Sequence, residues 1–234
     1  MMTMTLEMGR DSEECIRWKQ GRGWVYQLLI DFFGNRPSLS LIAQWQKHMV
    51  TREEAVLTKE GQKLKSYLSN TMPEHFMEIC KVERAEYHRL FDGVRPILPS
   101  LCESDYRSML SKNSVDYTSD IRNSYAQSGI VFNKLHLEQD DHISIELEYM
   151  AVLGERMSDD LRLRASQHAL MDSQIQFLEQ HVMQWVPSVA EALCKEARSP
   201  IYRSLGYILQ EFLPYDIAML RSWRAELNSC LIIS

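Results

Sequence analysis

The sequence contains few of the residues that interrupt regular secondary structure, with nine glycines and seven prolines among 234 residues. Between them, apolar side chains recur every three or four positions, which is the pattern of amphipathic helices. The chain contains no series of short segments with the alternating pattern of β-strands. It also has neither an internal repeat nor a low-complexity stretch. The sequence therefore predicts an all-α fold.

Cysteine is also scarce, and its spacing excludes two kinds of site. The five cysteines are odd in number, lie far apart and include no CxxC pair, which argues against a disulfide framework and against a cysteine zinc site. We expect reduced thiols. The five are Cys15, Cys80, Cys102, Cys194 and Cys230.

Positive charge and long apolar runs are lacking as well. Lys and Arg number 26 against 32 Asp and Glu, so the formal net charge is −6. This balance is opposite to that of a nucleic-acid-binding protein. The first eleven residues contain no apolar signal region, and no run is long enough to cross a membrane. We expect a cytoplasmic protein with no nucleic-acid partner and no membrane span.

The common catalytic motifs are missing too. The chain contains no GxxxxGK[ST], GxGxxG, GxSxG or HExxH motif, so it offers no standard site for a nucleotide, for a serine hydrolase or for a zinc protease. No metal and no cofactor is predicted. With 45% hydrophobic residues, the chain can bury one large core, and we assign residues 1–234 to a single domain.

The helical stripes and their end signals predict about ten helices. Ser38 or Ser40 is expected to cap the second helix, and Thr51-Arg-Glu-Glu54 resembles a capping box ahead of the third. Prolines are expected at the first turns of the last three helices. The predicted helices cover 24–33, 41–49, 55–68, 74–91, 116–127, 142–156, 159–185, 187–197, 200–212 and 214–227.

One central segment breaks this pattern. Gly93, Pro96 and Pro99 stand in or beside residues 94–113, which cannot form one regular helix. The sequence predicts a single helical-bundle domain with a proline-containing hinge at residues 93–115. A hinge between two halves is a common route to swapped dimers, so both a monomer and a hinge-mediated dimer are expected states.

The densest polar group lies just after this segment, at Glu138, Asp140, Asp141, His142 and Glu146. His142 and Glu146 are four residues apart and share one helix face. A carboxylate beside a histidine can tune its pKa or share a metal. The alternative is structural: Asp140 or Asp141 caps the helix, and His142 and Glu146 form a surface pair.

A second group precedes the same segment. Tyr87, Leu90 and Phe91 have helical spacing, and Glu103 and Tyr106 follow the prolines. Aromatic residues at this spacing usually pack in a core. Beside a broken backbone, they also suit an apolar peptide that carries arginines.

These segments resemble the TorD/DmsD/NarJ-like redox-enzyme maturation chaperones. Residues 138–153, EQDDHISIELEYMAVL, are similar to the family signature, an acidic-proline-x-Asp-His segment followed by a helix, although Gln139 stands where proline is usual. Residues 86–91 resemble the family's (W/Y)xxLF element, and residues 102–106 its E-S-x-Y element. Residues 22–29 and 177–187 resemble its first helix and its late W-x-P helix.

The resemblance implies an all-helical chaperone without enzymatic activity. Its partners would be the catalytic subunit of a molybdenum-cofactor oxidoreductase and the twin-arginine signal peptide of that subunit, which it would hold until the cofactor is inserted. The residues that match the family's client-binding elements are Tyr87, Leu90, Phe91, Asp141 and His142, with Glu103 and Tyr106 as further members. In this hypothesis the apolar part of the peptide lies on Tyr87, Leu90 and Phe91, and its arginines meet Asp141.

Two other functions stay open. A generic helical adaptor would share the fold and differ only in its partner. A metal- or nucleotide-dependent helical enzyme would use Glu138, Asp141, His142 and Glu146. A di-iron bundle requires two ExxH motifs, and the chain has none.

Overall fold

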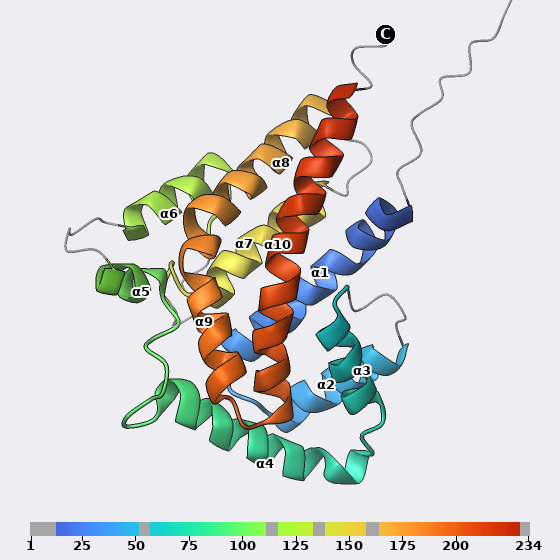
Figure 1. The fold of residues 1–234 in the computed structure, drawn as a ribbon, viewed down its shortest axis with the longest axis vertical. Coiled ribbons are helices and arrows are strands. Elements are labelled where there is room, and N and C mark those ends of the chain that lie inside the picture. The colour runs from blue at the N-terminus through green and yellow to red at the C-terminus, as the bar shows by residue number, and fades with distance from the viewer. Residues whose placement is uncertain (1–12, 52–56, 111–116, 133–138, 158–163, 230–234) are drawn as a thin grey trace, which may run out of the picture.

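A computed structural model describes residues 13–51, 57–110, 117–132, 139–157 and 164–229. These residues form a helical bundle without a β-strand, as the sequence predicts (Figure 1). Helix α4 runs across one end of the bundle (Figure 1). The helices are α1 (Glu13–Gly34), α2 (Leu39–Thr51), α3 (Lys59–Ser69), α4 (Phe76–Tyr87), α5 (Glu103–Leu110), α6 (Tyr117–Gln127), α7 (Ile143–Met157), α8 (Arg164–Phe177), α9 (Met183–Glu196) and α10 (Pro200–Ser229).

Helix α1 packs against both α7 and α10. Helix α1 runs antiparallel to α7, since Gly34 approaches Ser144 at one end and Arg22 approaches Gly154 at the other. Helices α9 and α10 pack as a hairpin. No helix among the described residues is long and apolar enough to cross a membrane, and none of the four described cysteines is in a disulfide.

A buried ion pair joins α1 to α10. The Arg22 guanidinium donates to both carboxylate oxygens of Asp216, at 3.0 and 2.7 Å. Trp18 Nε1 and Tyr26 OH donate to the same carboxylate, each at 2.7 Å. Both charged side chains are almost completely buried. Because the four donor contacts compensate for the lost hydration of Asp216, this carboxylate can lie inside the core.

The helix-end predictions for α2 and α3 have different outcomes. Ser38 caps α2, because its hydroxyl accepts a hydrogen bond from Leu41 N at 3.1 Å. The capping box at Thr51 is wrong. Thr51 is the last residue of α2, where its hydroxyl donates to Lys47 O, and residues 52–56 lie outside the described residues. The cap of α3 is Thr58, which accepts from Gly61 N.

Two predicted helix starts are also wrong. Pro187 and Pro214 lie inside α9 and α10 rather than at first turns. Each proline lacks one backbone donor, but burial of apolar side chains on both sides keeps the helix continuous. Around Pro214, Phe212 and Leu213 precede it and Ile217 follows it, and all three are buried. Pro200 does begin α10, as predicted.

The predicted helix over 159–185 has two parts where the structure describes it. Helix α8 ends at Phe177, a π-helical turn spans Leu178–Val182, and α9 follows at Met183. A second π-helical turn, His88–Asp92, ends α4, and a short 3₁₀ helix, Pro73–His75, precedes it. In the sequence, the first of these turns directly precedes the predicted hinge at residues 93–115, and the second follows it.

Candidate functional site

The joint is the segment of residues 93–102 between the π-helical turn and α5. It begins at Gly93, where a Cβ atom would lie 2.7 Å from the His88 carbonyl oxygen, so only glycine fits without a shift. Leu98 N then donates to Leu90 O at 3.0 Å. Further along, Ile143 N donates to Leu101 O at 2.8 Å. The joint is therefore bonded to the end of α4 on one side and to the start of α7 on the other.

Asp141 fixes the start of α5. Its backbone oxygen accepts from Glu103 N at 2.9 Å, and its carboxylate Oδ2 accepts from Ser104 N at 3.0 Å. Asp141 is therefore a cap, as one sequence interpretation held, but it caps α5 rather than the helix that follows it. Asp141 is completely buried, and its Oδ1 atom has no hydrogen-bond partner among the described residues.

His142 occupies the N-cap position of α7. Its carbonyl oxygen accepts from Ile145 N and Glu146 N, at 2.9 and 3.1 Å. Its ring Nδ1 is 2.8 Å from Ser144 Oγ. His142 and Glu146 are both buried, so the prediction of a surface pair is wrong. The helix face that they share points into the bundle, because its other members are apolar.

Glu146 and Glu103 are two buried carboxylates with different partners. Trp185 Nε1 donates to Glu146 Oε2 at 3.2 Å, and His181 Nδ1 donates to Glu103 Oε2 at 3.0 Å. Burial, together with the nearby Glu103 charge, raises the pKa of Glu146 well above its usual value. Glu103, in contrast, forms an ion pair with Arg107.

Arg107 connects this cluster to the surface. It donates to Gln180 O at 2.9 Å, and its guanidinium lies 4.0 Å from the centre of the Tyr117 ring. Arg107, Tyr117 and His181 also line an open polar cavity of about 730 Å³ between α5, α6 and the second π-helical turn. Tyr106 packs against Trp185, with ring centres 5.2 Å apart. The cavity gives solvent a route to the rim of the acidic cluster.

The aromatic group lies on the other side of the joint. Phe91 packs edge to face against Tyr87, Phe33 and Tyr202, with ring centres 5.1, 6.2 and 5.6 Å apart. Tyr87 and Phe91 are half-buried, and Leu90 is completely buried. The core-packing interpretation therefore holds for Leu90, while Tyr87 and Phe91 keep exposed edges. The joint beside them exposes apolar surface, since Val94 is 98% exposed and Ile97 47%.

The seven predicted site residues thus form two groups. One group is buried, at the start of α5 and α7, and contains Glu103, Tyr106, Asp141 and His142; the other contains Tyr87, Leu90 and Phe91. The joint connects them through its backbone hydrogen bonds. Sequence reasoning missed Arg107, although its place four residues after Glu103 on α5 is the usual spacing of a helical ion pair. It left His181 and Trp185 unassigned, because these partners lie on other elements and only packing brings them to Glu103 and Glu146.

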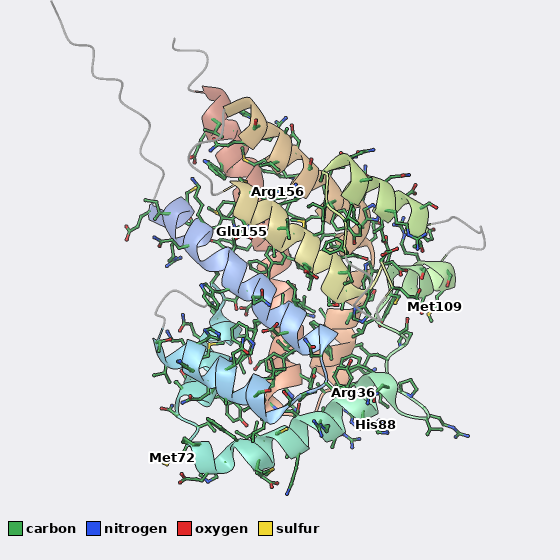
Figure 2. All side chains as sticks on the ribbon, turned by 180° about the vertical axis from the view of Figure 1, so that it is seen from behind. Arg36, Met72, His88, Met109, Glu155 and Arg156 are labelled. Carbon is green, nitrogen blue, oxygen red and sulfur yellow. The ribbon has the colours of Figure 1, made fainter. Side chains whose placement is uncertain are left out.

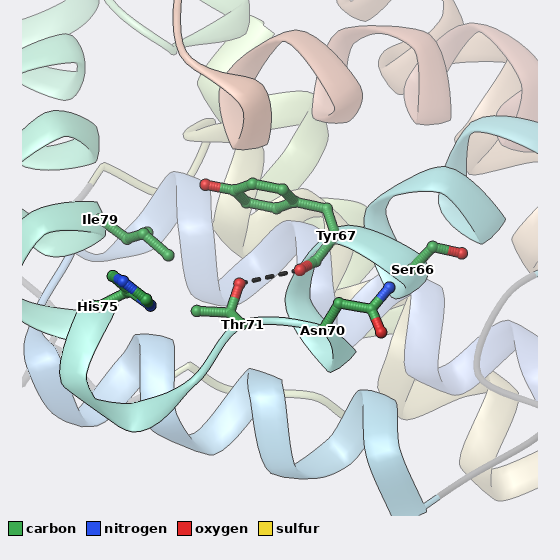
Figure 3. Close-up of a pocket in the computed structure, with 6 residues that line it drawn as sticks. All are labelled: Ser66, Tyr67, Asn70, Thr71, His75 and Ile79. Atoms are coloured by element: carbon green, nitrogen blue, oxygen red, sulfur yellow. Dashed lines mark hydrogen bonds between the residues drawn. The ribbon is translucent and has the colours of Figure 1, made fainter.

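The part of the chain that the structure describes contains no metal centre of the kind that the enzyme alternative requires. No group of three His, Cys, Asp or Glu side chains there could hold a metal ion, and Glu138 lies outside that part. A separate pocket of about 540 Å³ lies between α3 and the start of α4 (Figure 3). Its lining residues, which include Tyr67, Asn70 and His75, contain no carboxylate and no cysteine.

The fold and the joint define an all-helical bundle organised around a central connection between helices α4, α5 and α7. Residues 57–191, more than half of the chain, match the family described as nitrate reductase delta subunit. The chain belongs to this family, whose members are redox-enzyme maturation chaperones of the NarJ/TorD type. No curated protein matches the chain.

Proposed function

We propose that this protein is a cytoplasmic chaperone for the catalytic subunit of a molybdenum-cofactor oxidoreductase. It binds the twin-arginine signal peptide of that subunit and holds the subunit until the cofactor is inserted. The observation that carries this proposal is the family match over residues 57–191, a range that includes the joint and both groups of predicted site residues. The proposal includes no enzymatic activity.

In this proposal, Tyr87 and Phe91 contact the apolar part of the peptide. Their exposed edges adjoin the joint, where Val94 and Ile97 add exposed apolar surface. Apolar surface next to a polar rim is typical of a peptide-binding site. Leu90 is buried and supports this surface, because its carbonyl oxygen holds Leu98 N.

Asp141, His142, Glu103 and Tyr106 have a positioning role in this proposal. They are buried, so a peptide on the surface does not touch them. Asp141 instead holds α5 through its hydrogen bond to Ser104 N, and Glu103 holds the second π-helical turn through His181. Their loss changes the shape of the joint, and thereby the surface offered to the peptide.

The test compares Phe91→Ala and Asp141→Asn with the unmodified protein in titrations with a twin-arginine signal peptide. Removing the Phe91 ring is expected to lower peptide affinity at least about tenfold. Asp141→Asn should cost about 1 kcal/mol of stability, because it weakens a cap, and should lower affinity by a smaller factor. Thermal melts of each variant separate loss of fold from loss of binding. Unchanged affinity in both variants would refute this site assignment.

A further inference from the structure

A groove between α1 and α7 has the features of a second peptide-contact surface. It has a volume of about 620 Å³, within the range of ligand sites. Figure 2 shows α1 and α7 side by side on the face that bears it, with Arg36 just beyond one end of α1 and Glu155 toward the other end of the pair. The groove follows α1 from Lys19 to Asn35. We infer that it binds an extended apolar peptide segment that carries arginine or lysine.

Part of the groove wall is apolar, and there is open space beside Gly23. Trp24 and Ile30 of α1 face Ala151 and Val152 of α7, and all four are half-buried. Gly23 also lines the groove, and a Cβ atom there would have no atom within 4 Å. The space beside Gly23 is therefore empty in the folded protein.

The charges along the groove select a basic partner. Glu148 and Glu155 form no hydrogen bond or ion pair with any described residue. The Asp31 carboxylate accepts hydrogen bonds from Gln27 and Trp45, both of which are neutral. Three carboxylates thus line the groove without a positively charged partner among the described residues. Its two basic residues are already engaged, since Lys19 lies over the Trp223 ring and Arg22 is paired with Asp216.

A buried donor without a partner lies beneath the groove. Only 3% of the Arg22 surface is exposed, and its Nη1 atom has no hydrogen-bond partner among the described residues. Gly154 lies directly beside this atom, because a Cβ atom at that position would be 3.4 Å from Nη1. An unmade hydrogen bond of a buried donor costs free energy.

One end of the groove, at Asn35, lies near the joint. Phe33, near the end of α1, contacts Phe91, and Arg36 is paired with Asp92 at 2.6 Å. From Arg22 to Asn35 the helix rises about 20 Å, which an extended peptide covers in about six residues. A peptide whose apolar part lies at the joint can therefore place its basic residues beside the groove carboxylates. This inference rests on the proposed function and assigns the arginine contacts, which buried Asp141 cannot make on the surface.

The experiment compares Gly23→Leu with Gly23→Ala. Both substitutions improve helix propensity, but only leucine fills the groove. The probe is a labelled synthetic peptide of about fifteen residues, with two adjacent arginines followed by leucine and alanine; a second peptide has glutamine in place of both arginines. We expect Gly23→Ala to bind the arginine peptide as the unmodified protein does. Gly23→Leu should bind it at least about tenfold more weakly.

A charge-matched pair of variants tests the carboxylates. Glu148→Gln with Glu155→Gln should weaken binding of the arginine peptide by about threefold to tenfold and leave the glutamine peptide unaffected. The control is Glu74→Gln with Glu78→Gln, which removes the same charge from exposed positions near the start of α4. Equal affinity in the groove pair and in the control pair would overturn the charge assignment.

The outcomes separate the groove from the proposed function. Peptide binding by the unmodified protein that Gly23→Leu leaves unchanged overturns the groove and preserves the proposed function. No binding of either peptide by the unmodified protein overturns both. Light scattering completes the test: a dimer that Gly23→Leu converts to a monomer would assign the groove to a second copy of the chain, and would overturn the peptide assignment.

Discussion

Glu83 is a buried carboxylate where α4 meets the start of α10. It accepts hydrogen bonds from Ser199 Oγ at 2.6 Å and from Ile201 N at 3.2 Å, so it caps α10. Burial raises its pKa from 4.5 to about 7, although these hydrogen bonds favour the charged form. The folded state therefore holds this proton more tightly than the unfolded state. The contribution of this protonated carboxyl to the free energy of unfolding is fully present below pH 4.5 and is lost as the pH rises through 7.

We predict that Glu83→Gln reduces the pH dependence of stability. In the unmodified protein the Glu83 contribution falls by up to about 3 kcal/mol between pH 4.5 and pH 8. Glutamine stays neutral and keeps an oxygen that accepts from Ser199 or Ile201. Urea unfolding at several pH values in this range measures the difference. Glu226→Gln, at an exposed position of α10, is the control and should follow the unmodified protein. If the free energy of unfolding of Glu83→Gln changed with pH as steeply as that of the control, the account would be contradicted.

Asp216 supports a second prediction at this scale. Asp216→Asn leaves the Arg22 guanidinium buried without its counter-charge, so we expect a loss of about 3–5 kcal/mol in the free energy of unfolding. Asp172 forms an ion pair with Arg224 at the surface, and Asp172→Asn should cost less than about 1 kcal/mol. Denaturant unfolding of the two variants gives both values. Similar losses in the two would show that the buried pair has no special role.

Single residues also show what the sequence could predict. That Asp141 acts as a helix cap followed from the capping preference of aspartate, and the cap at Ser38 followed from its position before an apolar stripe. The helix that Asp141 caps could not be predicted, because Ser104 is 37 residues away. For the same reason, the partners His181 and Trp185 carried no local signal.

At the scale of elements, the period of apolar residues predicted most helices but not their junctions. The sequence predicts two helices that meet at Pro214, because a proline usually ends a helix. The structure has one continuous helix there, because burial against neighbouring helices outweighs one missing hydrogen bond. The segment predicted as irregular contains α5, an eight-residue helix. Short helices of this kind depend on tertiary contacts, here on Asp141 and Arg107.

Pro214→Ala should stabilise the protein by about 1–3 kcal/mol, since alanine restores a backbone donor in the middle of α10. The matched control is Pro200→Ala. Pro200 stands at the first position of the same helix, where the missing N–H has no acceptor within the helix, so the change should be close to neutral. Thermal and urea unfolding of both variants provide the comparison. Equal stabilities would mean that α10 has already adjusted fully to its inner proline.

At the scale of the whole molecule, the bundle holds three sets of groups in a fixed order. The groove between α1 and α7 ends at Asn35, next to Arg36, which pairs with Asp92 beside Phe91. The joint connects Tyr87 and Phe91 to the buried cluster around Asp141. The family match covers residues 57–191, which include the joint, the aromatic residues and the buried cluster. Sequence patterns identified the joint and the aromatic residues. They could not reveal the groove, because it forms only where α1 and α7 meet.

The central claim is that the chain binds the catalytic subunit of a molybdenum-cofactor oxidoreductase. Its most direct test is affinity purification of the tagged, full-length protein from its source grown anaerobically, with proteins in the eluate identified by mass spectrometry. The Phe91→Ala variant, purified in parallel, controls for non-specific capture. The account predicts that such a catalytic subunit co-purifies with the unmodified protein, and less of it with the variant. An eluate without any molybdenum oxidoreductase subunit, or with equal amounts from both proteins, would contradict it.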